Sequence, residues 1–180
     1  MRIISGTYRG KKLLSPTSEA VRPTSDRARE AVFNILYSKL SGALAEYSLL
    51  DVFSGSGAFA LEAVSRGIQK VGMIDIDTRP LLKNTALFPK EKNKISVMRL
   101  DACNLPPASE KYDLLFMDAP YNQGLSERAL QQLQLKGWLK PGALCMVELE
   151  RGEQIMLPDG YEQIDERRYG LAKVLFLKLR

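Results

Sequence analysis

One stretch decides the fold of this chain: Leu49-Leu50-Asp51-Val52-Phe53-Ser54-Gly55-Ser56-Gly57-Ala58-Phe59-Ala60-Leu61-Glu62-Ala63. It predicts a short buried strand, a glycine turn and the start of a helix. Gly55 and Gly57 have no Cβ, so a ligand can approach the backbone closely at this turn. The amides of the turn and the helix N-terminus then point into a crevice that suits a nucleoside-bearing cofactor. The dinucleotide-binding fingerprint ends in glycine or, in its permissive form, alanine, and Ala60 meets only the permissive form. The alternative is a plain strand-to-helix turn whose glycines serve packing.

The length of 180 residues predicts one domain with a sizeable core and a small N-terminal extension. An apolar share of 45% and a charged share of 26% are typical of soluble globular proteins. No apolar run is long enough to span a bilayer, and the first residues lack the apolar region of a signal peptide. Cys103 and Cys145 need no disulfide framework, so we expect a cytoplasmic protein without membrane contact.

The absence of histidine from the sequence limits the chemistry. It excludes a histidine general base and histidine metal ligands. Two distant cysteines cannot supply the four thiolates of an all-cysteine zinc site. We therefore expect no metal site.

The positive charge is concentrated at the N-terminus. Of the formal net charge of +5, a net +4 lies in residues 1–30, which hold seven arginines and lysines against three acids. A basic end on a nearly neutral body suggests an anionic partner, with nucleic acid as the first candidate. A basic surface that serves only solubility is the alternative.

Residues 1–15 predict a small hairpin, and a helix follows through about residue 40, capped by Thr24 or Ser25. The candidate nucleic-acid-binding residues are Arg2, Arg9, Lys11, Lys12, Arg22 and Arg27, with Arg9, Lys11 and Lys12 at the hairpin tip. Arginine suits phosphate because its planar fork binds oxygens in pairs. For Arg22, Arg27 and Arg29, which cluster near the start of this helix, pairing with Asp26 and Glu30 is the alternative.

Beyond the glycine turn, strand-like and helix-like segments alternate. Strands are predicted at residues 70–77, 95–100, 112–117 and 143–149, helices at 78–88 and 125–135, a loop at 137–142, and two final strands at 161–168 and 173–178. This alternation predicts a Rossmann-like α/β fold, with a mostly parallel seven-stranded sheet and helices on both faces. Residues 1–40 would form a basic hairpin and helix, and residues 41–180 the main domain.

Acids follow the second and third predicted strands. In doubly wound folds, an acid about 20 residues after the glycine turn accepts hydrogen bonds from ribose hydroxyls. Asp75 lies 18 positions after Gly57 and is our candidate for this role. Asp101 could accept from an adenine amine while a neighbouring amide reads a ring nitrogen. For each acid, a turn or cap role is the alternative.

Asp118-Ala119-Pro120-Tyr121 follows the fourth strand, at the edge where ligands of open α/β sheets bind. Asp118 and a backbone carbonyl can accept hydrogen bonds from an amino group, and Pro120 makes the turn rigid. Tyr121 offers a flat face for a base drawn out of its stack. The alternative is an Asx-Pro turn with a packed tyrosine.

This second motif suits attack by an exocyclic amine on an activated methyl group. A sulfonium is already a good leaving group, so little acid–base help is needed. Catalysis would come from alignment of nitrogen, methyl carbon and sulfur, and from stabilisation of the charge that develops on the amine.

Together these residues resemble the RsmD family, bacterial S-adenosylmethionine-dependent methyltransferases that act on guanine N2 of small-subunit ribosomal RNA. The matching stretches span nearly the whole chain and are MRIISGTYRGKKL, VRPTSDRAREAVFNIL, LLDVFSGSGAFALEAVSRG, YDLLFMDAPY and RRYGLAKVLFLK. The resemblance implies methyl transfer from S-adenosylmethionine to a guanine of that RNA, either free or in the assembling small subunit. We expect a monomer.

The resemblance also implies a role for each motif residue. Asp51, Ser54, Gly55, Ser56 and Gly57 would hold the methionine end of the cofactor; Asp75, with Ile76 beside it, the ribose; Asp101 and Ala102 the adenine; and Asp118, Pro120 and Tyr121 the guanine. Three positions depart from the family pattern without loss of a functional group. Ala119 replaces a proline and frees one φ angle, Asp75 replaces a glutamate, and Ala60 replaces a glycine.

Two other functions remain as alternatives. Adenine-N6 methyltransferases acting on DNA or RNA share both motifs, but the DNA enzymes carry a larger target-recognition region than 180 residues allow. A non-catalytic RNA-binding factor of ribosome assembly is the other, and the intact Asp118 and glycine turn argue against it. A nicotinamide dehydrogenase is disfavoured because its chemistry does not use the second motif.

Overall fold

The computed structural model describes residues 1–15, 26–40 and 43–180. Its helices are α1 (Asp26–Lys39), α2 (Ala58–Ser65), α3 (Arg79–Thr85) and α4 (Leu125–Leu135), with short 3-10 turns η1 (Leu44–Glu46) and η2 (Pro89–Lys94). Its strands are β1 (Ser48–Val52), β2 (Lys70–Asp75), β3 (Ile95–Arg99), β4 (Tyr112–Asp118), β5 (Leu139–Glu150), β6 (Tyr161–Tyr169) and β7 (Ala172–Leu179).

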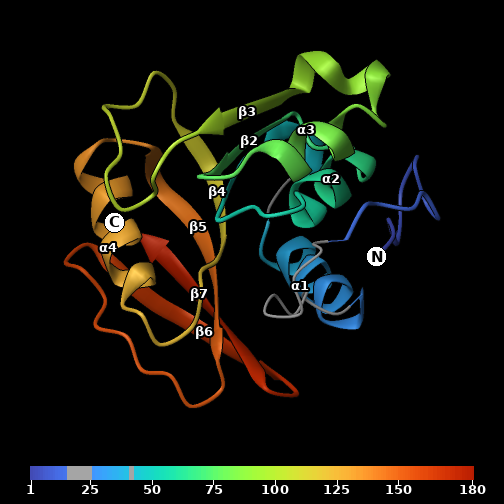
Figure 1. The fold of residues 1–180 in the computed structure, drawn as a ribbon. Helices are drawn as coiled ribbons and strands as arrows, with labels where there is room; N and C mark the ends of the chain where they lie inside the picture. The colour runs from blue at the N-terminus through green and yellow to red at the C-terminus, as the bar shows by residue number, and fades with distance from the viewer. Residues whose placement is uncertain (16–25, 41–42) are drawn as a thin grey trace.

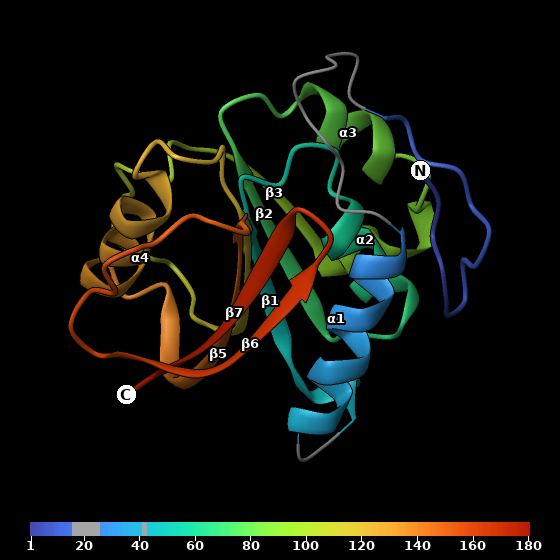
Figure 2. The ribbon, with the colours of Figure 1, turned by 90° about the horizontal axis from the view of Figure 1, so that it is seen from below.

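The strands form one seven-stranded sheet in the order β3-β2-β1-β4-β5-β7-β6. Neighbouring strands from β3 to β5 are parallel, and β7 lies antiparallel to both β5 and β6. Helices α1, α2 and α3 cover one face and α4 covers the other (Figures 1 and 2). The predicted Rossmann-like fold with a mostly parallel sheet is therefore confirmed.

Each face of the sheet has its own apolar core, because successive side chains of a strand point to opposite faces. In β1, Leu50 packs in the cluster under α4, whereas Leu49 packs in the cluster under the other three helices. Phe33 of α1 stacks on Phe59 of α2, which stacks on Phe116 of β4, with ring centroids 4.6 and 3.7 Å apart. This stack holds α1 against the sheet.

In the described residues the predicted element boundaries hold to within about two residues, with two larger differences. Strand β5 begins at Leu139, whereas the sequence predicts a loop up to residue 142. Leu139 lies opposite Tyr112, and Leu144 lies opposite Leu114. Between these two pairs β5 has more residues than β4, and its extra residues form a bulge that contains Gly142 at a φ of +81°. The helix predicted through residue 88 ends at Thr85 and is followed by η2.

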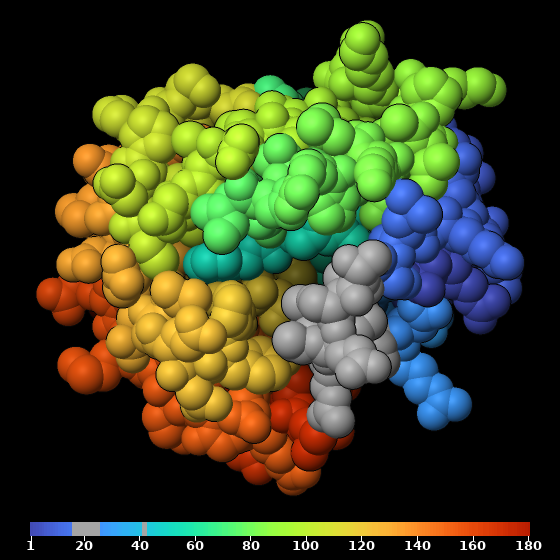
Figure 3. Space-filling model, in the orientation of Figure 1, coloured from blue at the N-terminus to red at the C-terminus, as the bar shows by residue number. Residues whose placement is uncertain are grey.

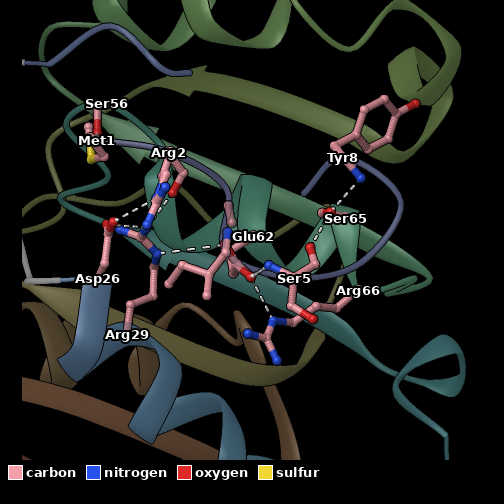
Figure 4. Close-up of polar contacts among 12 residues, drawn as sticks. Met1, Arg2, Ser5, Tyr8, Asp26, Arg29, Ser56, Glu62, Ser65 and Arg66 are labelled. Atoms are coloured by element: carbon pink, nitrogen blue, oxygen red, sulfur yellow. Dashed lines mark hydrogen bonds and ion pairs between the residues drawn. The ribbon is translucent and has the colours of Figure 1, made fainter. Parts of the chain in front are cut away.

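The N-terminal segment, residues 1–15, folds back on itself through one antiparallel bridge between Arg2 and Lys12. It lies against α2, where the Glu62 carboxylate accepts hydrogen bonds from the amides of Ile4 (2.7 Å) and Ser5 (3.0 Å) (Figure 4). Further backbone hydrogen bonds join the two arms beside this bridge, so the predicted hairpin is present in a short form. The predicted cap of α1, at residues 24 and 25, lies outside the described residues.

Candidate active site

The carboxyl ends of the central strands bring the two sequence motifs together. Val52 at the end of β1 lies opposite Ile74 of β2 and opposite Met117 of β4. Phe53 and Asp118 therefore follow at adjacent strand ends, and Gly55 lies two residues beyond Phe53. The glycine turn and the Asp118 motif occupy the same edge, as predicted for open α/β sheets.

The two glycines of the turn serve different purposes. Gly57, at a φ of +76°, is the N-cap of α2, and a Cβ there would lie 2.9 Å from side-chain atoms of Leu81 and Met73. Gly55, at a φ of +55°, would meet no atom within 4 Å if it carried a Cβ. Gly57 therefore allows tight packing behind the turn, whereas Gly55 leaves open space beside its backbone.

Both serines of the turn make hydrogen bonds to neighbouring elements, one to backbone and one to a side chain. The Ser54 hydroxyl lies 2.5 Å from the carbonyl oxygen of Asp51 and 3.2 Å from that of Ile74. The Ser56 carbonyl accepts a hydrogen bond from Asn84 Nδ2 at 2.8 Å. These contacts hold the turn against β1, β2 and α3.

Two carboxyl groups flank the turn in different environments. Asp51 is 2% exposed, and its Oδ2 accepts a hydrogen bond from the Ala60 amide at 3.2 Å. Burial raises the pKa of Asp51 to about 8, and the charge of Asp75 adds to the rise. Asp75 is half-buried, and its two oxygens accept hydrogen bonds from the amides of Gly55 (2.8 Å) and Asp77 (3.0 Å).

A pocket of about 340 Å³ opens beside these groups, within the range of small-molecule sites. It is lined by five predicted site residues, Asp75, Ile76, Asp101, Ala102 and Pro120, together with Phe53, Ile74, Leu100, Cys103, Gln123, Leu125 and Arg128. The lining combines apolar walls with two acids, one at the end of β2 and one in the loop after β3, and with the polar side chains of Gln123 and Arg128. The other predicted cofactor and catalytic residues lie outside this lining. Among the described residues, no group of three or more Cys, Asp and Glu side chains is placed to hold a metal ion.

The loop after β4 carries the predicted catalytic residues. Asp118, at the strand end, lies opposite Glu148 of β5, and the Tyr121 hydroxyl donates to Glu148 Oε1 at 3.2 Å. Burial first, and then the charges of Asp118 and Glu148, raise the pKa of Tyr121 above its usual range. Tyr121 therefore stays protonated at neutral pH and cannot act as a base, while Pro120 is exposed at the pocket.

The predicted RNA-binding residues are arranged on and beside the N-terminal segment. Arg2, Arg9, Lys12 and Arg27 are exposed. Lys11 lies instead against the protein, with its ammonium 2.8 Å from the carbonyl oxygen of Leu87 and over the rings of Tyr8 and Phe88. Arg22 lies outside the described residues. In Figure 3 the N-terminal residues, in blue, adjoin the green surface of α3 and η2.

Sequence reasoning missed three groups at this edge. Phe53 lines the pocket at a φ of +59°, a conformation that bulky residues rarely adopt. Arg128 of α4 also lines the pocket. Asn84 of α3 is fully buried against the glycine turn. The sequence carries no local signal for any of them, because each role depends on contacts between distant segments.

The comparisons with known proteins match this arrangement over nearly the whole chain. The family model described as Conserved hypothetical protein 95 matches residues 1–178. A ribosomal RNA small subunit methyltransferase D from Haemophilus influenzae is 33% identical over 178 residues, covering 96% of this chain and 90% of the relative. Its counterpart in Escherichia coli K12 is 36% identical over 154 residues, covering 83% of this chain and 75% of the relative. A solved structure of a candidate methyltransferase from Escherichia coli is 31% identical, with a TM-score of 0.84 and coverage of 99% and 97%.

Proposed function

This chain belongs to the RsmD family of methyltransferases, and on that premise we propose that it methylates the N2 amine of a guanine in small-subunit ribosomal RNA, with S-adenosylmethionine as donor. The RNA substrate is inferred from the names of the relatives, and the guanine N2 from the resemblance of the motifs. One observation carries the proposal: Asp75, Asp101 and Pro120 line a single pocket beside the open backbone of Gly55.

The chemistry of these residues fits the cofactor. The pocket walls of Phe53, Leu100 and the 69% exposed Ile76 offer apolar contact to a flat base. Asp75 supplies carboxylate oxygens suited to a ribose diol, and Asp101 lines the pocket at the next loop. The open space at Gly55 and the adjacent Asp51 suit a chain that carries an ammonium group, whose charge favours ionisation of Asp51.

Asp118, Pro120 and Tyr121 are the proposed acceptor side of the site. The bound cofactor would supply a methyl group on a sulfonium sulfur. As the guanine nitrogen bonded the methyl carbon, the carbon–sulfur bond would break with its electron pair left on sulfur, and the nitrogen would then release a proton to solvent. The Asp118 carboxylate would orient the guanine amine by accepting its hydrogen bond, and would stabilise the positive charge that develops on the nitrogen. The Tyr121 ring would stack on the base, held in place by its hydroxyl bond to Glu148.

The N-terminal segment would bind the RNA backbone around the target base. The segment reaches the glycine turn, since the Met1 sulfur lies 3.7 Å from the Ser56 hydroxyl. The division into residues 1–40 and 41–180, the monomeric state and the cytoplasmic location remain predictions. No helix in the described part of the chain is long and apolar enough to cross a membrane.

The decisive experiment measures incorporation of a labelled methyl group from S-adenosylmethionine into small ribosomal subunits that lack the modification. The parent should label the RNA at guanine N2, and Asp118→Ala should lose this activity by about 100-fold or more while still binding the cofactor. Duplex DNA should not be labelled. Equal labelling by parent and Asp118→Ala, or labelling of DNA in preference to RNA, would overturn the proposal.

A further inference from the structure

Asn84 joins two segments of the site that are far apart in the sequence. It lies on α3, is fully buried, and its Nδ2 donates to the carbonyl oxygens of Ser56 (2.8 Å) and Leu14 (3.1 Å). Its Oδ1 accepts a hydrogen bond from the Leu14 amide at 2.8 Å. Both amide hydrogens and the carbonyl of this side chain are therefore in use, shared between the N-terminal segment and the glycine turn.

Only a carboxamide can make this set of contacts. Leu14 presents both a donor and an acceptor, and Ser56 presents a second acceptor, so the side chain between them must supply two donors and one acceptor. An aspartate could accept from the Leu14 amide but would face the two carbonyl oxygens without a proton to donate. Because the site is buried, each of those carbonyls would then lose its partner at a cost in free energy.

The two ends of this bridge border the two proposed ligands. Ser56 lies between Gly55 and Gly57, where the cofactor would approach the backbone. Leu14 follows Lys12 by two residues, on the arm of the N-terminal segment that carries the proposed RNA contacts. Other hydrogen bonds of this segment run to α2, through Glu62 and Ser65 (Figure 4). The Asn84 bridge thus binds both the segment and the turn through one side chain.

We propose that Asn84 is a positioning residue that couples RNA binding on the N-terminal segment to cofactor binding at the glycine turn; this inference rests on the proposed function. RNA that orders the segment also orders the Leu14 end of the bridge, and through it the Ser56 backbone. The cofactor then binds a turn whose position is already set, so it loses less conformational entropy. By thermodynamic linkage, the cofactor raises the RNA affinity by the same factor.

The test is the affinity for S-adenosylhomocysteine, the demethylated cofactor, measured by calorimetry with and without saturating small-subunit ribosomal RNA. The demethylated form prevents turnover during the measurement. For the parent, we expect RNA to tighten binding about fivefold or more, at the lower end of known coupling. Asn84→Asp retains the acceptor for the Leu14 amide but loses the donated bonds to the carbonyl oxygens of Ser56 and Leu14, so we expect that ratio to fall to about one.

Ser65→Ala is the matched control. The Ser65 hydroxyl accepts from the Tyr8 amide at 2.9 Å and donates to the Ser5 carbonyl at 2.6 Å, without contact to the glycine turn. This variant loosens the same segment at the far end of α2, so its coupling ratio should stay at the parent value. If the coupling ratio depended only on how firmly the segment is attached to the protein, it would fall in both Asn84→Asp and Ser65→Ala.

A second measurement needs no variant. In the parent, RNA alone should slow hydrogen exchange at the amides of the glycine turn, before any cofactor is added. If the parent binds both ligands with a coupling ratio of one and unchanged exchange, only the inference is overturned. If the parent binds neither RNA nor S-adenosylhomocysteine, the proposed function is overturned and the inference with it.

Discussion

The Gly55 amide donates a hydrogen bond to Asp75 Oδ2 at 2.8 Å, which joins the glycine turn after β1 to the end of β2. The carboxylate proposed to bind ribose therefore also sets the backbone that the methionine end of the cofactor would approach. Asp75 Oδ1 accepts in turn from the Asp77 amide, so rotation of the carboxylate would break hydrogen bonds on both sides. The two halves of the proposed cofactor site are one hydrogen-bonded unit.

Asp75→Ala should therefore weaken binding of S-adenosylmethionine by about 10- to 100-fold, the range expected for loss of hydrogen bonds to a charged group. Calorimetric titration measures this directly. Asp77→Ala is the matched control, because its carboxylate pairs with Arg79 and does not line the pocket. A similar loss in both variants would indicate general damage to the loop, contrary to the prediction.

Asp51 should make the stability of the protein depend on pH. Its pKa is about 8 in the folded state, against about 4 in the unfolded chain, so the folded state binds the extra proton between these values. The free energy of unfolding should fall as pH rises from about 4 to about 8, by at most about 1.4 kcal/mol per pH unit from this group, and then level off. Asp51→Asn should remove this part of the slope.

The measurement for Asp51 is urea unfolding of the parent and Asp51→Asn at about pH 5, 6.5 and 8, which samples the window between the two pKa values. Asparagine keeps an oxygen that can accept from the Ala60 amide, so the comparison isolates the charge. The free-energy difference between the two proteins should grow in favour of the variant as pH rises. Parallel curves for the two proteins would show that Asp51 does not titrate in this range.

Part of this site could be predicted from local sequence patterns. The apolar run before Gly55 predicts β1, and the regular spacing of strands and helices places Asp75, Asp101 and Asp118 at strand ends. Because the carboxyl ends of parallel strands meet at one edge, the spacing also predicts that these acids converge. Asp75, Asp101 and the loop after Asp118 do contribute to one pocket.

The remaining contacts depend on tertiary packing, which leaves no periodic signal. Asn84 and Glu62 are polar residues on helices, and the ordinary interpretation of such residues is a solvent-exposed face. Both are fully buried, and both are hydrogen-bonded to the N-terminal segment. The partners of Asn84 lie 70 and 28 positions away in the sequence, so no local pattern could connect them. Phe53 likewise has no residue-type signal for its positive φ.

Glu62 should be the most costly acid to remove. Its carboxylate is buried and accepts from the Ser5 amide and from Arg66 Nε at 2.8 Å, with Arg29 Nε at 3.8 Å (Figure 4). Glu62→Ala would leave the charges of Arg29 and Arg66 buried without this partner, so we expect a loss of about 3–5 kcal/mol in the free energy of unfolding.

Chemical unfolding measures the effect of Glu62→Ala, and the exposed pair of Glu162 and Arg180 provides the control. Glu162→Ala should cost less than about 1 kcal/mol, as is usual for a surface ion pair. Amides of Ile4 and Ser5 should also exchange faster in Glu62→Ala, because they lose their acceptor. Equal stabilities of the two variants would contradict the role assigned to Glu62.

Arg9 and Lys12 should contribute to RNA affinity by neutralising phosphate groups. Replacing both by glutamine should weaken RNA binding and reduce the slope of log affinity against log salt by about 0.7 for each phosphate that is no longer neutralised. Lys111→Gln is the control, since Lys111 is exposed immediately before β4, at the sheet edge opposite Asp118. An unchanged salt slope in the double variant would exclude these residues from the RNA interface.

Tyr121 should act through its ring more than through its hydroxyl. Tyr121→Phe loses only the bond to Glu148, so its rate of methyl transfer should fall by no more than about tenfold, the value of one hydrogen bond. Tyr121→Ala also loses the stacking face, worth about 1–3 kcal/mol per base, and should be slower again by about 5- to 150-fold. Single-turnover methylation of RNA by both variants, at saturating S-adenosylmethionine, separates the two effects. If Tyr121→Phe were as slow as Tyr121→Ala, the hydroxyl and its bond to Glu148 would carry the function, and stacking would not.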